Sequence, residues 1–157
     1  AETDVRAMGR VSKGVRGMRL PEDHSVISMV IPESDGFLLI VCENGYGKRT
    51  KVDEFPTKGR GGKGMIAIQA SERNGPLVGA TQLFTGDEIM LISDQGTMVR
   101  TRGDEVSVVG RNTQGVRIIR LKENENLVSL ARIAEPEEDD FVESESDGAE
   151  IEDSTTD

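Results

Sequence analysis

The sequence repeats itself about every 51 residues, and this period restricts the possible folds more than any other feature. The segment Gly9-Arg-Val-Ser-Lys-Gly-Val-Arg16 returns as Gly59-Arg-Gly-Gly-Lys-Gly-Met-Ile66 and again as Gly110-Arg-Asn-Thr-Gln-Gly-Val-Arg117. We call these three segments anchors 1, 2 and 3. Between the second and third copies the register holds without a gap, since Asp53-Glu54 recurs as Asp104-Glu105. Repetition on this scale predicts an array of similar units that bury their apolar faces against one another.

Each repeat has the pattern of short β-strands separated by Gly, Asn, Asp or Pro, and no segment keeps a helical period. The strand-like segments are 26–31, 37–43, 46–52 and 116–121. Asn44-Gly45 predicts a tight hairpin with a primed turn, because both residues tolerate positive φ, and Gln95-Gly96 occupies the same place one repeat later. Four short strands in about fifty residues are typical of a propeller blade. The chain has two full repeats and a partial one at each end, so we expect an all-β, incomplete ring.

The net charge of −10 is unevenly distributed along the chain. Residues 135–157 contain twelve Asp or Glu and no Lys or Arg, which leaves residues 1–134 with 17 acidic and 19 basic residues. A block of like charge with few large apolar residues cannot bury enough surface to offset its chain entropy. We therefore expect a β-domain over residues 1–134, carrying about +2, and a disordered acidic tail over residues 135–157.

Several classes of protein are excluded by what the sequence lacks. It has no apolar run of eighteen residues and no signal peptide, so we expect a soluble cytoplasmic protein, and its start at Ala1 suggests an excised segment. Cys42 has no partner for a disulfide or a multi-cysteine metal site, and we expect it to be a buried strand residue. His24 is also alone and is expected in a loop. We expect neither a metal site nor a catalytic site.

Several motifs in the same order resemble the C-terminal domain of the A subunit of DNA gyrase, a type IIA topoisomerase. They are the three anchors, the Asn44-Gly-Tyr-Gly-Lys-Arg-Thr50 hairpin, Val109-Gly-Arg-Asn-Thr-Gln-Gly115 and the acidic terminus after Ala134-Glu-Pro136. The resemblance runs from Ala1 to about Pro136. The basic box of that family, Gln-Arg-Arg-Gly-Gly-Lys-Gly, is matched best by Lys58-Gly-Arg-Gly-Gly-Lys-Gly64, which departs at its first two positions. We therefore expect the true box to lie upstream.

The resemblance implies a six-bladed β-pinwheel whose blades exchange a strand, of which this chain would supply about three blades. It implies nonspecific binding of double-stranded DNA, which bends around a basic rim, in a nucleoid-associated bacterial enzyme that introduces negative supercoils. That enzyme contains two A and two B subunits and hydrolyses ATP. By the resemblance, ATP, Mg²⁺ and the cleaving tyrosine belong to other parts of the enzyme, and this chain needs no cofactor and no membrane.

DNA wrapping without sequence choice requires cations spaced along a rigid surface, because each neutralised phosphate releases counterions and no base edge is read. Glycines beside the cations would also let a phosphate approach backbone N–H groups. An alternative is that these are ordinary solvated charges, some paired with Asp53, Glu54, Asp104 or Glu105, and that Arg49 and Arg100, near the end of a strand, bond between blades. The candidate DNA-binding residues are Arg10, Lys13, Arg16, Lys48, Arg49, Lys51, Lys58, Arg60, Lys63, Arg100, Arg102, Arg111 and Arg117.

Competing functions have weaker support. Gly59–Gly64 fits the letters of the dinucleotide fingerprint, but the strand-like segment 65–69 follows it where a helix would be needed. Tyr46, the only tyrosine, is expected to pack on the hairpin or to contact DNA, since its repeat equivalent is Thr97. The remaining alternatives are the related C-terminal domain of topoisomerase IV and a propeller that serves as a protein-interaction scaffold, although the chain has no tryptophan and so no Trp-Asp signature.

Overall fold

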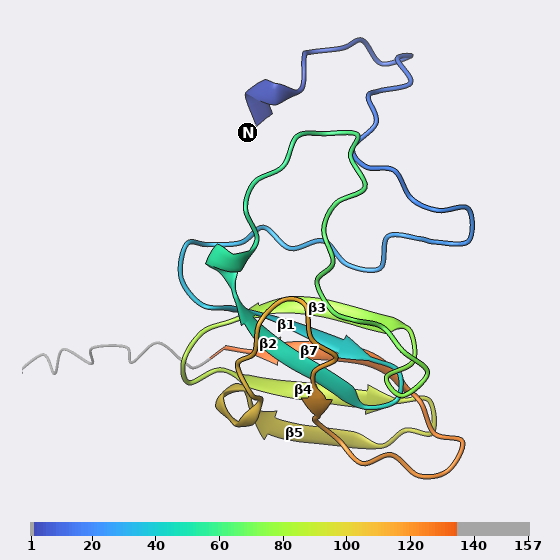
Figure 1. The fold of residues 1–157 in the computed structure, drawn as a ribbon, viewed down its shortest axis with the longest axis vertical. Helices are drawn as coiled ribbons and strands as arrows, with labels where there is room; N and C mark the ends of the chain where they lie inside the picture. The colour runs from blue at the N-terminus through green and yellow to red at the C-terminus, as the bar shows by residue number, and fades with distance from the viewer. Residues whose placement is uncertain (1, 135–157) are drawn as a thin grey trace, which may run out of the picture.

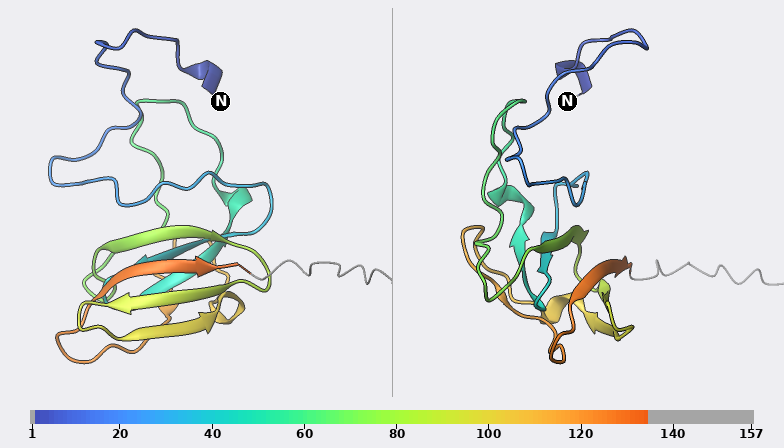
Figure 2. Two further views of the ribbon diagram at one scale, coloured as in Figure 1. Left: turned by 180° about the vertical axis from the view of Figure 1, so that it is seen from behind. Right: turned by 90° about the vertical axis from the view of Figure 1, so that its right-hand side faces the viewer.

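The computed structural model describes residues 2–134, and the expected acidic tail lies outside them. The described chain forms two antiparallel sheets that pack against each other, while its N-terminal part and the connection after the first hairpin project away from them (Figures 1 and 2). The strands are β1 (Phe37–Cys42), β2 (Tyr46–Lys51), β3 (Leu77–Leu83), β4 (Glu88–Ser93), β5 (Met98–Arg102), β6 (Val116–Arg117) and β7 (Leu127–Ile133). Three short 3₁₀ turns complete the elements: η1 (Glu2–Asp4), η2 (Val52–Glu54) and η3 (Gly103–Glu105).

The two sheets are two copies of one unit. The first has the strand order β3-β1-β2-β6 and the second β5-β4-β7. β1, β2 and β3 correspond to β4, β5 and β7 one repeat later, and η2 corresponds to η3. The fourth strand of the first sheet, β6, comes from anchor 3 in the following repeat and pairs its Val116 with Gly47 of β2. The repeat thus builds propeller-like blades that share a strand.

The main core lies between the two sheets, because the strands of each turn one apolar face toward the other. It contains Leu39, Val41, Leu83, Ile89, Leu91, Val106, Ile119 and Leu127. In β4 the buried positions alternate with half-buried ones, as the period-2 geometry of a strand requires. β1 is buried on both faces, and its Ile40 and Cys42 pack with Ile68 on the outer side. The expectation that Cys42 is a buried strand residue is therefore confirmed.

The hairpin turn forms where it was predicted, but with a different geometry. The amide of Gly45 donates to the carbonyl of Cys42 at 3.1 Å, and Gly45 has a φ of +77°. Asn44 is not among the residues with positive φ, so the predicted primed turn is wrong. The three-residue loop is instead a tight turn followed by one left-handed glycine, and Gly96, with a φ of +81°, repeats it in the second sheet. The pattern predicted the position of the turn correctly because glycine was required in either geometry.

Three of the strand-like segments differ from expectation. Residues 26–31 and 65–69 form no strand, and of residues 116–121 only the first two do. The equivalent of residues 26–31 one repeat later is β3, which pairs with β1, and among residues 2–134 the segment 26–31 has no such partner strand. A strand needs a hydrogen-bonded neighbour, and without one Val26, Met29 and Ile31 remain exposed. The described residues therefore form two sheets, although about three blades were expected.

Candidate nucleic-acid interface

The residues that follow anchor 1 lie beside anchor 2 on the projecting part of the chain, although about fifty positions separate the two anchors. The amide of Gly61 donates to the carbonyl of Gly17 at 2.7 Å, and that of Arg19 donates to the carbonyl of Gly62 at 2.8 Å. They border a cavity of about 430 Å³ that is lined by Gly17, Met18, Lys58, Gly59, Gly62, Lys63 and Gly64. Two lysines and a glycine-rich backbone around one hollow make a cradle suited to an anion.

The glycines in and beside the anchors have two different structural roles. Gly14, Gly64 and Gly115 occupy the same place in the three copies and all have φ between +76° and +77°, which strains any residue with a side chain. Gly17 and Gly59 have no positive φ, and a Cβ at either would meet no atom within 4 Å. Their backbone therefore borders open space that a phosphate oxygen could enter.

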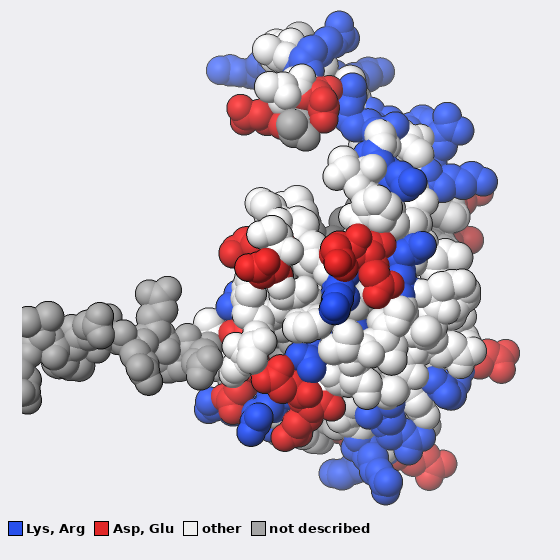
Figure 3. Space-filling model, turned by 60° about the vertical axis from the view of Figure 1, so that its left-hand side comes forward, with Lys and Arg blue, Asp and Glu red and all other residues white. Residues whose placement is uncertain are grey.

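The six candidate cations of anchors 1 and 2 are accessible. Arg10, Lys13, Arg16, Lys58, Arg60 and Lys63 are all exposed. Among residues 2–134 none of these six forms an ion pair with a carboxylate. Lys and Arg side chains gather along these projecting loops and again at the opposite end of the molecule (Figure 3). The alternative that the predicted cations are neutralised by acidic neighbours therefore has no support at five of these six, whereas Arg60 lies near enough to Asp4 for their charges to attract.

Anchor 3 is packed onto the first sheet more tightly than the other two. The carboxylate of Glu54 accepts from the backbone N–H of Arg111 at 2.9 Å, and the guanidinium of Arg111 donates to the carbonyl of Ile66 at 2.6 Å. Arg111 is half-buried as a result, whereas Arg117 at the end of the anchor is exposed. A Cβ on Gly115 would lie 2.5 Å from the carbonyl oxygen of Gly47, so the strand exchange depends on that glycine.

The prediction that Lys48 contacts DNA is wrong, because its side chain is fully buried in this structure. Its ammonium donates to the carbonyl of Gly110 at 2.9 Å, to that of Arg111, and to the carbonyl and hydroxyl of Thr113 at 3.4 and 3.3 Å. Burial lowers the pKa of Lys48 from its ordinary value, since desolvation disfavours the charged form. Lys48 fastens anchor 3 to the first sheet, and a phosphate cannot reach it.

Arg49 is also inside the protein, so its predicted contact with DNA is corrected in the same way. Its guanidinium forms an ion pair with Asp104 at 2.8 Å, donates to the carbonyl of Val106 at 2.8 Å and lies 4.8 Å from the ring of Phe37. The pKa of the Asp104 carboxyl is lowered, first by the Gly86 amide that donates to it and then by Arg49. Because Arg49 belongs to the first sheet and Asp104 to η3 of the second, the pair joins consecutive blades.

The remaining hairpin cations differ from one another. Lys51 and Arg102 are exposed at the ends of β2 and β5. Arg100 is exposed but forms an ion pair with Glu88 on the neighbouring strand, which already neutralises its charge. The predicted set therefore divides into exposed cations without an ion pair, the ion-paired Arg100, the half-buried Arg111, and two buried residues, Lys48 and Arg49, that join one repeat to the next.

Tyr46 lies beside two arginines, one of which was not among the sequence candidates. The guanidinium of Arg73 is 4.6 Å from its ring centre and that of Arg117 is 5.2 Å away. No sequence signal marked Arg73, because it belongs to a turn that only the fold brings to the hairpin. Among residues 2–134 no group of three or more His, Cys, Asp or Glu could hold a metal ion, and no helix is long and apolar enough to cross a membrane.

Comparison with known proteins identifies the family. The model of the DNA gyrase C-terminal domain, beta-propeller, matches residues 1–33, 36–82 and 87–134, three segments that follow the repeat. The chain is 56% identical over 139 residues to the DNA gyrase A subunit of Salmonella typhimurium, covering 88% of this chain and 16% of that protein. It is 58% identical over 136 residues to the DNA gyrase A subunit of Pseudomonas aeruginosa, covering 87% and 15%. The chain thus spans about a sixth of the length of these relatives.

Solved structures share the same fold. A structure of a DNA gyrase A C-terminal domain superposes with a TM-score of 0.70 at 31% identity, over 83% of this chain and 45% of that one. The C-terminal domain of a DNA topoisomerase IV superposes with a TM-score of 0.74 at 22% identity, over 84% and 42%, which shows a common fold alone.

Proposed function

The chain belongs to the family of DNA gyrase C-terminal, beta-propeller domains, and on that premise we propose that it binds duplex DNA without choosing a base sequence and bends it around its cationic edge. The observation that carries this function is the glycine-lined hollow beside anchor 2, which Lys58 and Lys63 line, with the exposed cations Arg10, Lys13, Arg16 and Arg60 on the same projecting part of the chain. Duplex DNA carries one negative charge per about 1.7 Å of its axis, and such a surface can exchange its condensed counterions for protein cations.

The relatives that the chain resembles are DNA gyrase A subunits, and their full length is about six times the part matched here. We propose that this chain is a non-catalytic part of such a bacterial topoisomerase. The DNA-cleaving tyrosine, the ATP site with its Mg²⁺ and the B subunits of an A2B2 assembly would then lie outside the chain. Its contribution to negative supercoiling would be to present a wrapped segment of DNA to the rest of the enzyme, at the nucleoid in the bacterial cytoplasm.

The test is a titration of two duplexes of unrelated sequence at several salt concentrations. Lys58→Gln and Lys63→Gln should each weaken binding equally for both duplexes and each reduce the slope of log affinity against log salt by about 0.9, the value for one phosphate contact. Arg100→Gln is the matched control, because that cation is already paired with Glu88, and it should leave the slope unchanged.

Two results would contradict nonspecific wrapping. Strong dependence on base sequence would require direct readout of base edges, which phosphate contacts do not provide. An absence of duplex binding even at low salt would instead favour a propeller that serves as a protein-interaction scaffold.

A further inference from the structure

A second cluster of cations lies at the hairpin end of the first sheet and is built around Tyr46. The Arg117 guanidinium donates to the Tyr46 hydroxyl at 2.6 Å, and the guanidinium of Arg73 donates to the carbonyl of Gly115 at 3.1 Å. Both guanidinium groups also stack near the tyrosine ring, at 5.2 and 4.6 Å from its centre. One aromatic side chain therefore fixes two arginines that belong to distant parts of the sequence.

The backbone that carries these side chains is held firmly. The Asn44 side-chain amide donates to the carbonyls of Glu72 and Arg73, both at 3.1 Å, and attaches their turn to the hairpin. Asn74 is fully buried and donates to the carbonyls of Gln69 and Gln114 at 3.0 and 2.9 Å. Three segments thus meet in a fixed arrangement, so the arginines lose little freedom when they bind a ligand.

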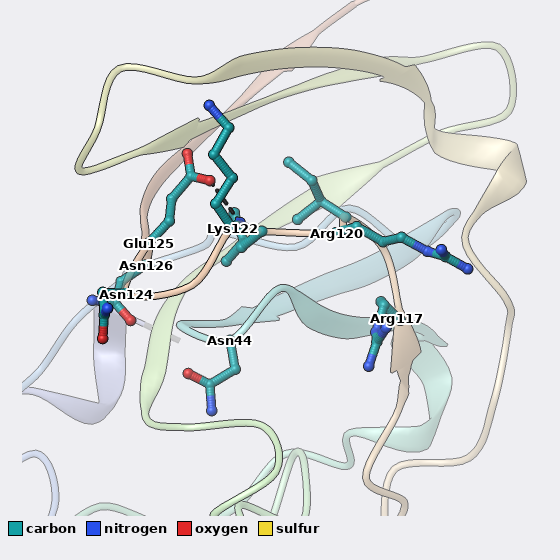
Figure 4. Close-up of a pocket in the computed structure, with 9 residues that line it drawn as sticks. Asn44, Arg117, Arg120, Lys122, Asn124, Glu125 and Asn126 are labelled. Atoms are coloured by element: carbon teal, nitrogen blue, oxygen red, sulfur yellow. Dashed lines mark hydrogen bonds between the residues drawn. The ribbon is translucent and has the colours of Figure 1, made fainter.

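The cluster continues along the segment that follows β6. Arg117, Arg120 and Lys122 line a pocket of about 500 Å³ next to the hairpin turn (Figure 4). Arg120 extends away from Glu125, the acidic residue of the pocket lining, whose carboxylate accepts from the backbone N–H of Lys122 at 2.8 Å (Figure 4). The other oxygen of that carboxylate accepts from the hydroxyl of Ser93 at 2.6 Å. Glu125 is therefore engaged by its own neighbours.

Arg73, Arg117 and Arg120 have no ion pair with an acid within the part of the chain that the structure describes, whereas the charge of Lys122 lies near the Glu125 carboxylate. Arg73, Arg117, Arg120 and Lys122 are all exposed and form no ion pair with a carboxylate among residues 2–134. An arginine fork binds the two free oxygens of a phosphate through parallel hydrogen bonds, and stacking on an aromatic ring orients the fork for this. A phosphodiester matches this chemistry better than a flexible acidic peptide, because the two forks are already fixed in place.

We propose that Arg73 and Arg117, oriented by Tyr46, form a phosphodiester-binding site for duplex DNA that is separate from anchors 1 and 2. This rests on the proposed function and extends the DNA path. β2 runs from Tyr46 to Lys51, and at about 3.3 Å per residue the two ends are about 17 Å apart. The connection through η2 then leads to anchor 2. A stretch of duplex as long as β2 presents about ten phosphate charges.

The test measures duplex affinity and its salt slope for four variants of this chain. Arg73→Gln and Arg117→Gln should each reduce the slope by about 0.9. Tyr46→Leu removes no charge, yet it should weaken binding at least as much as Arg117→Gln, because it releases both arginines. Tyr46→Phe keeps the ring and should lose less.

Adding Tyr46→Leu to the double variant Arg73→Gln/Arg117→Gln distinguishes positioning from a general structural effect. If Tyr46 acts only by orienting the two arginines, the triple variant should bind little more weakly than the double variant, since interacting residues are not additive. Fully additive losses would overturn the positioning role of Tyr46.

Two further outcomes separate this site from the proposed function. If Lys58→Gln lowers the salt slope while Arg73→Gln and Arg117→Gln do not, the hairpin-end site is overturned and DNA binding by the anchors stands. If none of these variants affects duplex binding, both are overturned. If the arginine variants lose affinity for a polyglutamate peptide but keep their affinity for the duplex, the site serves acidic protein segments and the phosphodiester assignment is wrong.

Discussion

Gly45 and Gly96 allow the cost of a left-handed backbone to be separated from the cost of a close contact. They occupy the same place in consecutive blades and have nearly the same φ, +77° and +81°. A Cβ on Gly96 would meet nothing within 4 Å, whereas one on Gly45 would lie 2.6 Å from the carbonyl oxygen of Ile119. Substitution by alanine therefore imposes the same backbone strain at both positions but a steric clash only at the first.

The magnitudes follow from these contacts. Left-handed backbone costs a residue with a Cβ about 1–2 kcal/mol, so Gly96→Ala should lower the free energy of unfolding by that amount. At Gly45 the clash must also move the segment whose Ile118 and Ile119 amides donate to the Gly45 carbonyl at 2.9 and 3.2 Å. Weakening two hydrogen bonds, each worth about 0.5–1.5 kcal/mol, raises the expected cost of Gly45→Ala to about 2–5 kcal/mol.

Urea unfolding of the two variants beside the parent chain provides the measurement, with unfolding monitored by the loss of β-sheet circular dichroism. Gly96→Asn is a useful third variant, because asparagine tolerates the left-handed region and should cost less than alanine. Equal losses for Gly45→Ala and Gly96→Ala would refute the reasoning, since they would mean that the approach of Ile119 to the hairpin contributes nothing to stability.

Three further outcomes are expected. Lys48→Met should destabilise the chain by about 1–3 kcal/mol in urea unfolding, because it removes the donor shared by several part-buried carbonyls of anchor 3; Lys51→Met, at an exposed position of the same strand, is its control. Hydrogen bonds from Ser93, Thr97 and the Lys122 amide lower the pKa of Glu125 to about 2 from an ordinary 4.5. Its stabilising contribution is thus complete above about pH 4.5 and lost as the pH falls toward 2, so Glu125→Gln should flatten the acid limb of stability against pH. Truncation after Ala134 removes twelve acidic residues and should tighten duplex binding at low salt but not at high salt, where screening weakens competition by the tail.

The sequence predicted the repeating β architecture because a fifty-one-residue period and a strand pattern are local signals. The same signals predicted the hairpins and the equivalence of β1 and β4. They also marked the cations of anchors 1 and 2, which are accessible. The segment 26–31 has the same apolar pattern as β3 and yet forms no strand, because pairing depends on a neighbouring strand that residue patterns cannot supply. A strand pattern therefore predicts the capacity to pair and not the pair itself.

The assignments of individual cations could not be settled from sequence for a related reason. Lys48 and Arg49 stand next to each other in a basic hairpin, and their neighbours along the chain suggest exposure. Their burial arises from anchor 3 and η3, which are more than fifty positions away. Conversely, nothing in the sequence marks Arg73 as a candidate, and only the fold places it against Tyr46. Contacts between repeats determine which charges remain free for a ligand.

The exchanged strand β6 also has a consequence for synthesis of the chain. Val116, which completes the first sheet, follows the last residue of β2 by 65 positions. At about 5–20 residues per second, the ribosome needs about 3–13 s to make that stretch, so the β2 edge waits unpaired while a second blade is being translated. An unpaired edge is open to pairing with other chains. During this interval the unpaired edge of β2 can pair with another nascent chain. Misassembly is therefore expected to begin between neighbouring copies on the same polysome.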